Sequence, residues 1–331
     1  MPLVSVRDLK RHYDIRLTGG LFGRRAKLKA VDGVSFDLKM GETLGLVGES
    51  GCGKSTTAKL VLGLIPATSG TVSFDGSAVT AAHDAQWRHM RRRMQMIYQD
   101  PLGALDRRLP VSAQIGEPIA VHEPHVPADE REARVGEIMT SVGLRADQAA
   151  SYPHELSGGQ RQRVVIARAL ALQPDFIVCD EPVSALDVSI QAQVLNLLED
   201  LKERNGFTSL FISHDLKVVR QMSDRVAVMY LGMIVEEGPP EDVFHAPMHP
   251  YTQALVSAIP TPSRRGKRER IVLEGDPPNP VNKPSGCPFH PRCPSAMSEC
   301  REFQPMLASH GSRKVACHLR PAPSAGLIAA E

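Results

Sequence analysis

A glycine-rich segment, residues 48–55, fits the pattern G-x-x-x-x-G-K-[ST] without deviation. Glycines let successive backbone N–H groups curl around phosphate oxygens, and the start of a following helix adds positive potential. The lysine of such a loop reaches the β- and γ-phosphates, and the final hydroxyl ligates Mg²⁺. The alternative is a glycine-rich turn without a ligand. The pattern predicts a phosphate-binding site that consists of Gly48, Glu49, Ser50, Gly51, Cys52, Gly53, Lys54, Ser55 and Thr56.

Two acidic residues, Asp180 and Glu181, follow directly after the apolar run 176–179. In a nucleotide site the first acid holds the Mg²⁺ shell, and the second, one residue past the strand end, reaches the water beside the γ-phosphate. We therefore expect Asp180 to bind Mg²⁺ with Ser55 and Glu181 to act as the general base. Acid pairs at strand ends are common by themselves, so this prediction depends on the phosphate loop.

A second candidate anion site consists of Ser157, Gly158, Gly159 and Gln160, at the start of a predicted helix that runs to Leu172. Ser157 suits a helix N-cap, and the glycines leave backbone donors open at the positive helix end. A plain helix cap is the alternative. One nucleotide cannot easily use both anion sites of one chain. The economical arrangement is a head-to-tail pair, in which each ATP contacts one subunit's 48–55 loop and the other subunit's Ser157 and Gly159.

The elements that must position these residues follow from the hydrophobic pattern. An apolar run at Thr43–Val47 enters the phosphate loop, and Lys54–Leu64 is predicted to be a helix. Other segments alternate between the two types, which favours an α/β fold with a largely parallel sheet. Between Asp100 and Tyr152 the pattern is mostly helical, and after about His249 it becomes rich in proline and basic residues. The further strands are expected at 94–98, 176–179, 209–212 and 225–230, and the further helices at 158–172 and 189–205.

Length and composition limit the possible functions. A chain of 331 residues can form one large domain with a smaller appendage, but it cannot hold two nucleotide-binding domains. The net charge is only +2, so no global field favours nucleic acid or an anionic membrane surface. No stretch of about 18 apolar residues occurs, and residues 1–12 lack an apolar signal core. We expect a cytosolic protein that reaches a membrane only through its partners.

Four cysteines near the C-terminus, Cys287, Cys293, Cys300 and Cys317, have the spacing C-x5-C-x6-C-x16-C. Disulfides are rare in a reducing compartment, and four thiolates in a short stretch suggest a soft metal centre. The spacing differs from the C-x2-C pairs of zinc ribbons. An iron–sulfur cluster, a zinc site and merely buried thiols all remain open on these residues. Cys52 and Cys179 lie within the nucleotide motifs, and we do not expect them to bind metal.

The phosphate loop, Leu156–Gln160, the acid pair and Ser213–Asp215 together resemble the ATP-binding cassette (ABC) family over residues of about 1–250. The resemblance implies a P-loop ABC-type nucleotide-binding domain with an antiparallel β subdomain and a helical subdomain at about 100–170. It also implies roles for four more residues. These are Gln99, which senses Mg²⁺ and the attacking water and leads into the permease-contacting helices; Asp187, which acts across the dimer; His214, which bonds the γ-phosphate and orients the water; and Tyr13, which stacks on adenine.

The segments Gly286–Cys293 and Val315–His318 resemble the C-terminal extension of dipeptide and oligopeptide importer ATPases, which would make residues 251–331 such an extension. In that group the four cysteines are associated with a [4Fe-4S] cluster, for which we expect a structural rather than a redox role. Relatives that carry nickel, glutathione or opines share the extension, so the cargo is left open.

Over nearly its whole length the chain resembles the second ATPase subunit of dipeptide permeases. The resemblance implies a peripheral subunit at the cytoplasmic face of the inner membrane, where ATP-driven dimer closure powers import. Its partners would be a second, homologous ATPase, two permease subunits and, indirectly, an extracytoplasmic binding protein. A soluble ABC ATPase that acts on nucleic acid or the ribosome is the alternative class. The balanced charge and the lack of a second cassette or a coiled-coil insertion argue against it.

Overall fold

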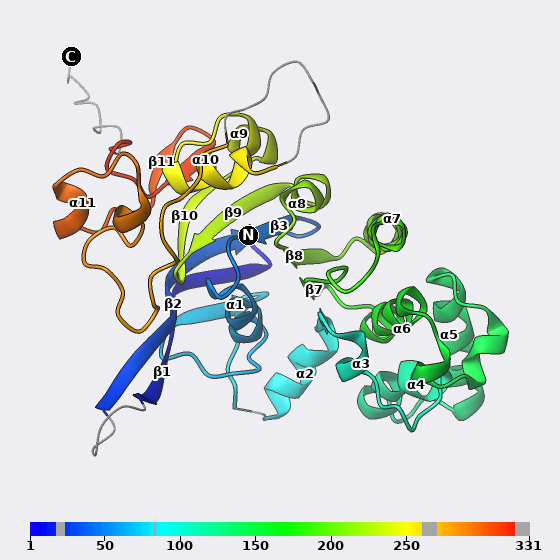
Figure 1. Cartoon of the computed structure of the whole chain (residues 1–331). Helices are drawn as coiled ribbons and strands as arrows, with labels where there is room; N and C mark the ends of the chain where they lie inside the picture. Colours follow the sequence, from blue (N-terminus) through cyan, green and yellow to red (C-terminus); the bar gives the residue numbers. More distant parts are fainter. Residues whose placement is uncertain (18–23, 83, 260–269, 322–331) are drawn as a thin grey trace, which may run out of the picture.

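The computed structural model describes residues 1–17, 24–82, 84–259 and 270–321 and contains two sheets and a separate group of helices (Figure 1). Most of the predicted basic linker, residues 260–269, lies outside the described residues. None of the described helices has both the length and the apolar character that a membrane span requires.

The larger sheet has the strand order β11-β12-β10-β9-β3-β8-β7-β6 among the described residues. Its central strands are parallel, as predicted, whereas β10, β12 and β11 extend one edge in antiparallel fashion. The sheet therefore combines a parallel half with an antiparallel edge. The strands are β3 (Thr43–Val47), β6 (Met94–Ile97), β7 (Phe176–Asp180), β8 (Thr208–Ile212), β9 (Arg225–Tyr230), β10 (Met233–Gly238), β11 (Ala308–His310) and β12 (Arg313–Val315).

The parallel strands are mostly apolar and almost entirely buried because both faces of the sheet are covered. In β7, Ile177 and Cys179 enter a core shared with the helical group, whereas Phe176 and Val178 enter a second core shared with the smaller sheet. Each core is thus built from alternate residues of the same strands. Because both faces of the sheet are packed, the positions of the strand ends are fixed. The site residues lie at those ends.

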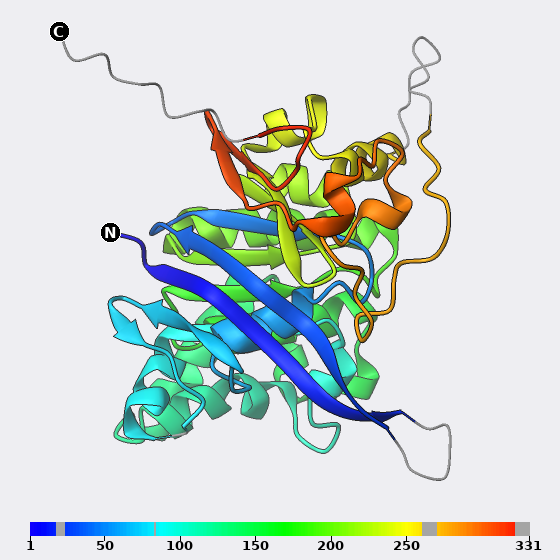
Figure 2. The same ribbon diagram turned by 90° about the vertical axis from the view of Figure 1, so that its left-hand side faces the viewer.

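The smaller sheet is antiparallel with the order β2-β1-β4-β5, which agrees with the antiparallel subdomain that the resemblance implies. Its main feature is the long hairpin of β1 and β2, which crosses the molecule diagonally in Figure 2. Val4, Val6 and Leu9 of β1 are completely buried against the second core. The strands are β1 (Val4–Leu17), β2 (Arg24–Leu38), β4 (Ser69–Phe74) and β5 (Ser77–Ala78).

The helices separate into two groups. The run from α3 to α6 lies between β6 and β7 in the sequence and to one side of the sheets in Figure 1, with α6 packed on the large sheet, as the prediction of an inserted helical subdomain requires. Helix α1 (Lys54–Val61) ends earlier than predicted, because Gly63 adopts a φ of +62° that terminates it. The other helices are α2 (Ala85–Arg93), α3 (Pro101–Ala104), α4 (Val111–His122), α5 (Ala128–Ser141), η1 (Ala146–Ala150), η2 (Pro153–Glu155), α6 (Gly158–Leu170), α7 (Val188–Asn205), α8 (Leu216–Met222), α9 (Pro240–His245), α10 (Pro250–Ser257), η3 (His290–Arg292) and α11 (Glu299–Glu302).

The C-terminal segment packs against the sheets instead of standing apart. Strand β12 pairs with β10, so the segment completes the large sheet. Phe289 packs against Tyr230 of β9 and Tyr251 of α10, with ring centroids 5.2 and 5.4 Å apart. Because β10 precedes residue 250 and β12 follows it, one sheet spans the predicted boundary at 250/251. That boundary stays a prediction.

Candidate nucleotide-binding site

The phosphate loop connects β3 to α1 as the sequence predicts. Gly48, Gly51 and Gly53 have φ values of +153°, +77° and +110°, which side chains rarely adopt. A Cβ atom at Gly48 would also lie 2.1 Å from the carbonyl oxygen of Met229. Both backbone conformation and space therefore require glycine at the start of the loop, and the chain curls tightly before the helix begins.

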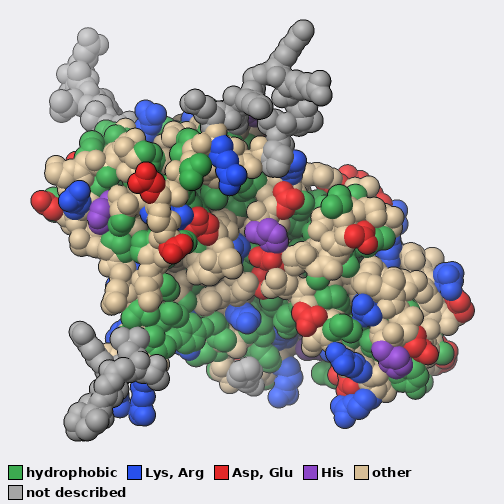
Figure 3. Space-filling view, in the orientation of Figure 1, with side chains coloured by type: hydrophobic (Ala, Val, Ile, Leu, Met, Phe, Trp, Pro, Cys, Tyr) green, Lys and Arg blue, Asp and Glu red, His purple; other side chains and the backbone are tan. Residues whose placement is uncertain are grey.

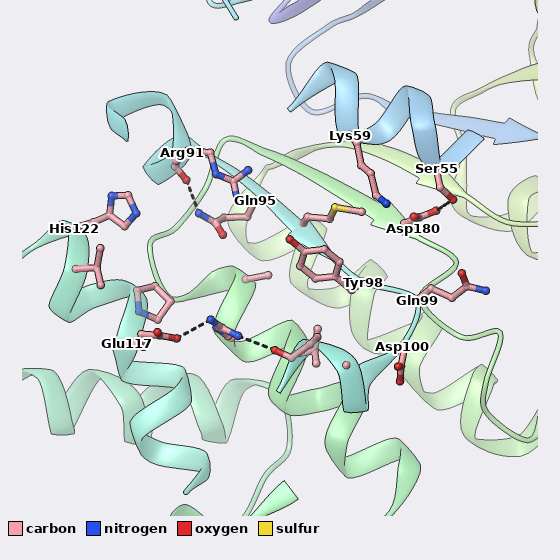
Figure 4. A pocket seen from close by; sticks show the side chains of 18 residues that line it. Ser55, Lys59, Arg91, Gln95, Tyr98, Gln99, Asp100, Glu117, His122 and Asp180 are labelled. Atoms are coloured by element: carbon pink, nitrogen blue, oxygen red, sulfur yellow. Dashed lines mark hydrogen bonds and ion pairs between the residues drawn. The ribbon is translucent and has the colours of Figure 1, made fainter. Parts of the chain in front are cut away.

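Lys54 and Ser55 begin α1 and point to different parts of the site. The Lys54 side chain is buried, and its Nζ donates to the carbonyl oxygens of Gly48 and Glu49 at 2.8 and 3.1 Å. The Ser55 hydroxyl donates to Oδ1 of Asp180 at 2.8 Å (Figure 4). Two of the three predicted Mg²⁺ ligands, Ser55 and Asp180, thus meet between α1 and the end of β7, and Gln99 is the third.

The electrostatics at Asp180 favour a cation. Burial raises the pKa of the Asp180 carboxyl, the Ser55 hydrogen bond opposes this, and the charge of Glu181 adds to it. A carboxylate whose ionised form is disfavoured by burial and a like charge gains from a nearby positive ion.

Glu181 lies at the centre of a small polar cluster. One of its carboxylate oxygens, Oε2, accepts from the Gln99 amide at 3.1 Å and lies 3.1 Å from Nδ1 of His214. The backbone of Glu181 has a φ of +48°, an uncommon conformation for a residue with a side chain, and such strain clusters at functional sites. The structure therefore brings together the three residues that were predicted to be catalytic.

Tyr13 lies on the same pocket as the phosphate loop. In the hairpin it pairs with Leu28, and both residues line a pocket that also includes Lys54, Glu181 and His214. Most of the described residues between Tyr13 and β3 belong to the hairpin of β1 and β2. The end of this hairpin leads the chain back to β3 and the phosphate loop. Arg11 stacks over the Tyr13 ring at 4.4 Å from its centroid.

The segment Ser157–Gln160 is positioned elsewhere. Ser157 is exposed and caps α6: its Oγ accepts from the Gln160 N–H, and the Gln160 side chain accepts from the Ser157 N–H. None of the described residues that line the phosphate-loop pocket comes from this segment. Asp187 is also exposed and caps α7 by accepting from the Ile190 N–H. The second anion site is therefore not assembled with the first within one chain.

Several residues at the site escaped the sequence analysis. Pro280 lines the pocket beside Tyr13, and Tyr251 and Arg292 both contact Glu49 of the phosphate loop. A further anchor joins Lys283 to Asp32 at 3.1 Å, and Asp32 also bonds His12. No local sequence pattern predicts these contacts, because each joins residues that are far apart in the chain.

The four C-terminal cysteines line one small cavity. Burial raises the pKa of the Cys287 thiol to about 11, and the charges of the other three thiols contribute to the shift, so the four lie near one another. Among the described residues, no three His, Cys, Asp or Glu side chains are arranged to hold a metal ion. Four thiols that line one cavity are the donor set of either an iron–sulfur cluster or a zinc site.

Comparison with known families agrees with this architecture. A strand, phosphate loop and helix beside a strand that ends in two acids define a nucleotide-hydrolysing class of proteins. Residues 31–184 match the family model described as ABC transporter, and residues 235–300 match the one described as oligopeptide/dipeptide transporter, C-terminal region. The chain belongs to the ABC transporter ATPases that carry this C-terminal region.

Curated relatives match almost the whole chain. The oligopeptide transport ATP-binding protein AppF of Bacillus subtilis is 50% identical over 322 residues, which cover 96% of this chain and 97% of AppF. The oligopeptide transport ATP-binding protein OppF of Salmonella typhimurium is 49% identical over 318 residues, covering 95% of each chain. OppF of Escherichia coli is 48% identical with the same coverage.

Solved structures share the nucleotide-binding part. The ATP-binding cassette MJ0796, in a dimeric post-hydrolysis state bound to ADP and Pi, superposes with a TM-score of 0.63 at 28% identity. It covers 72% of this chain and 98% of its own. CbiO1 from Clostridium perfringens, part of the ABC transporter complex cbiONQ, gives a TM-score of 0.63 at 26% identity, covering 74% of this chain and 91% of its own.

Proposed function

We propose that this chain is the ATP-hydrolysing subunit of a membrane importer for di- or oligopeptides. Relatives named as oligopeptide transport ATP-binding proteins match it over at least 95% of its length, and the C-terminal region has the corresponding family type. The subunit would lie at the cytoplasmic face of the inner membrane. It would work with a second, homologous ATPase, two permease subunits and, indirectly, an extracytoplasmic binding protein.

In the proposed site the 48–56 loop holds the triphosphate of ATP, and Tyr13 stacks on adenine. The loop glycines supply backbone N–H groups, and Lys54 leaves its own loop carbonyls to reach the β- and γ-phosphates. Ser55, Asp180 and Gln99 would bind Mg²⁺. The contact of Ser55 with Asp180 supports this role, since it already places two oxygen donors together. The metal would neutralise charge on the β- and γ-phosphates.

Glu181 acts as the general base in this proposal. Its strained backbone directs the carboxylate toward the pocket, where Gln99 and His214 converge on one oxygen. The other oxygen is then available to accept a proton from water, while His214 turns toward the γ-phosphate. A loose phosphoryl transition state needs an aligned water and charge neutralisation more than it needs covalent chemistry.

The observation that carries the proposal is the incompleteness of the site within one chain. At the Ser157–Gln160 helix end Ser157 is exposed and the other three residues are half-buried, and the segment does not line the phosphate-loop pocket. We infer that ATP completes the site by bridging two subunits, with Ser157, Gly158, Gly159 and Gln160 of one facing the loop of the other. Asp187, exposed at the start of α7, would contact the partner beside them. Closure assembles the groups, and hydrolysis releases them.

A groove of about 780 Å³ between the nucleotide-binding core and the helical group supports a permease contact. Figure 4 shows Tyr98 and Gln99 on one side of this groove and Glu117 and His122 of α4 on the other. Val121, 63% exposed, adds an apolar surface. Because Gln99 is shared between the groove and the site of Glu181, movement of a bound permease segment would reach the nucleotide directly.

For the C-terminal cavity we propose that Cys287, Cys293, Cys300 and Cys317 hold a [4Fe-4S] cluster with a structural role. When bound, the cluster would supply covalent iron–thiolate links between segments that also meet through hydrogen bonds, such as that from the Cys287 N–H to the Cys300 carbonyl oxygen at 2.8 Å. The lining of one small cavity by all four thiols supports this proposal.

The proposal is tested by purifying the chain with its partner ATPase and permease subunits in lipid. We expect ATPase activity that rises when a peptide-loaded binding protein is added. Stimulation by nickel, glutathione or opines instead would keep the machinery and change the cargo. Stimulation by DNA or ribosomes alone would replace the proposal with a soluble ABC ATPase. The mixed charge on the face in Figure 3, where basic and acidic side chains are interspersed, argues against that outcome.

A further inference from the structure

The turn between the first two C-terminal cysteines carries an arginine that contacts the phosphate loop. Arg292 ends the short helix η3, which lies between Cys287 and Cys293. Its Nη1 donates to Oε2 of Glu49 at 2.9 Å and its Nη2 donates to Oε1 at 3.2 Å. The Arg292 side chain is 8% exposed, so this two-point ion pair is largely shielded from water. Such pairs fix geometry strongly.

Glu49 is held at every polar group that it has. Its N–H donates to the Tyr251 hydroxyl at 2.9 Å, its carbonyl oxygen accepts from Lys54 Nζ at 3.1 Å, and its carboxylate accepts from Arg292. Only one residue, Ser50, separates Glu49 from the tightly curled Gly51. A displacement of the Glu49 side chain would therefore change both the entrance of the loop and the position of Lys54.

The cysteine turn is coupled rigidly to Arg292. The N–H of His290 donates to the carbonyl oxygen of Cys287 at 3.0 Å, and the N–H of Cys293 donates to that of His290 at 3.3 Å. Phe289 in the same turn is 1% exposed and packs against Tyr230 and Tyr251. The backbone hydrogen bonds and the buried Phe289 ring hold the turn in one conformation. A shift of the turn would therefore also move the Arg292 guanidinium.

We propose that Arg292 is a positioning residue that couples the cysteine site to ATP binding through Glu49. An ordered cysteine turn holds the phosphate loop ready for the triphosphate, and bound ATP in turn holds the cysteine turn in place. The two effects must be equal in free energy, since coupling between two binding sites is reciprocal. The inference rests on the proposed function of the 48–55 loop as the ATP site.

The first test measures the MgATP dissociation constant of the full chain by equilibrium dialysis. We expect Arg292→Met to weaken binding about tenfold and Arg292→Lys to recover part of the loss, a size typical of coupled sites. Glu49→Gln should also weaken binding, and Arg292→Met should add little in that background. The control is Arg313→Met, which removes an arginine of the same extension that contacts the carbonyl oxygens of Asp242 and Ala246. Unchanged affinity in Arg292→Met would overturn the proposal.

The second test reads the coupling in the other direction, without activity. After metal removal by a chelator, alkylation of individual cysteines by maleimide is followed by peptide mapping, with and without saturating MgATP. In the wild-type chain ATP should slow alkylation of Cys287 and Cys293, by about tenfold if the coupling matches the first test. In Arg292→Met this protection should disappear, whereas Cys52, inside the loop, should still be protected.

The outcomes separate the two proposals. If the wild-type chain fails to bind MgATP and Cys52 is not protected, the proposed function of the loop is wrong. If MgATP binds and protects Cys52 but Cys287 reacts equally with and without ATP, only the coupling is wrong. If MgATP protects Cys287 from alkylation equally in the wild-type and Arg292→Met chains, Arg292 does not transmit the coupling between the two sites.

Discussion

His214 and Glu181 meet at one carboxylate oxygen: the Nδ1 atom of His214 lies 3.1 Å from Oε2 of Glu181. The same oxygen accepts from Gln99, which begins the connection to the helical group. A change in the groove that Gln99 lines and a change at His214 therefore both act on the group proposed as the base.

Glu181→Gln should abolish turnover while leaving ATP binding intact. The amide keeps the size of the side chain but cannot accept a proton, and loss of a general base costs at least about 100-fold in rate. The variant should accumulate as an ATP-bound closed dimer, which size-exclusion chromatography with light scattering would detect in the presence of MgATP. Steady-state activity near the wild-type level in the assembled transporter would contradict the role of Glu181.

Asp180→Asn should weaken the dependence of ATP hydrolysis on Mg²⁺. The amide oxygen can still accept from the Ser55 hydroxyl, so the fold is retained, but the charge that attracts the metal is lost. We expect the Mg²⁺ concentration at half-maximal activity to rise about tenfold or more. If the Mg²⁺ concentration at half-maximal activity does not change, Asp180 is not a ligand of the metal.

Gly48→Ala should lower the free energy of unfolding by about 2–4 kcal/mol, because the new methyl group meets the Met229 carbonyl oxygen in a conformation unsuited to alanine. Gly136→Ala is the matched control. Gly136 lies in α5 with no atom within 4 Å of a new Cβ, so the change should stabilise the protein by about 0.5–1 kcal/mol. Denaturant unfolding of both variants gives the comparison, and equal shifts would contradict the geometry.

His249→Asn should reduce the loss of stability at acidic pH. Burial lowers the pKa of His249 to about 3, and its Nδ1 accepts from the Tyr251 N–H, so the folded protein holds the neutral ring. An unfolded histidine has a pKa of about 6.5. The unfolded state therefore takes up a proton that the folded state refuses, and this contribution to stability is present above pH 6.5 and is lost as the pH falls.

Asparagine can accept the same capping hydrogen bond without titrating. The free-energy difference between the wild-type and His249→Asn proteins should change in favour of the variant by about 2 kcal/mol between pH 7 and pH 5. Burial raises the pKa of the neighbouring Glu236, but this residue is present in both proteins and its effect largely cancels. A pH-independent difference, measured by urea unfolding, would show that His249 titrates normally in the folded chain.

Cys287→Ser and Cys293→Ser should each remove iron, acid-labile sulfide and visible absorbance from protein purified without oxygen. Cys52→Ser is the control, because Cys52 lies in the phosphate loop. A colourless wild-type protein that contains zinc in place of iron would contradict the cluster.

Short sequence motifs were sufficient to predict the residues proposed to bind and hydrolyse ATP. The phosphate loop, the acid pair after β7 and the cap of α6 each depend on a few consecutive residues, because glycine conformations, strand ends and helix ends are set over short distances. Most predicted strands and helices therefore lie within a few residues of those observed.

Only the tertiary structure decided which of these pieces meet. The hairpin that brings Tyr13 to the phosphate loop, and the contacts of Glu49 with Tyr251 and Arg292, join residues separated by up to 243 positions. Such contacts arise from the packing of whole elements, and no spacing rule within one element encodes them. The sequence alone determined a nucleotide site and a cysteine site, and the fold placed them on one connected set of side chains.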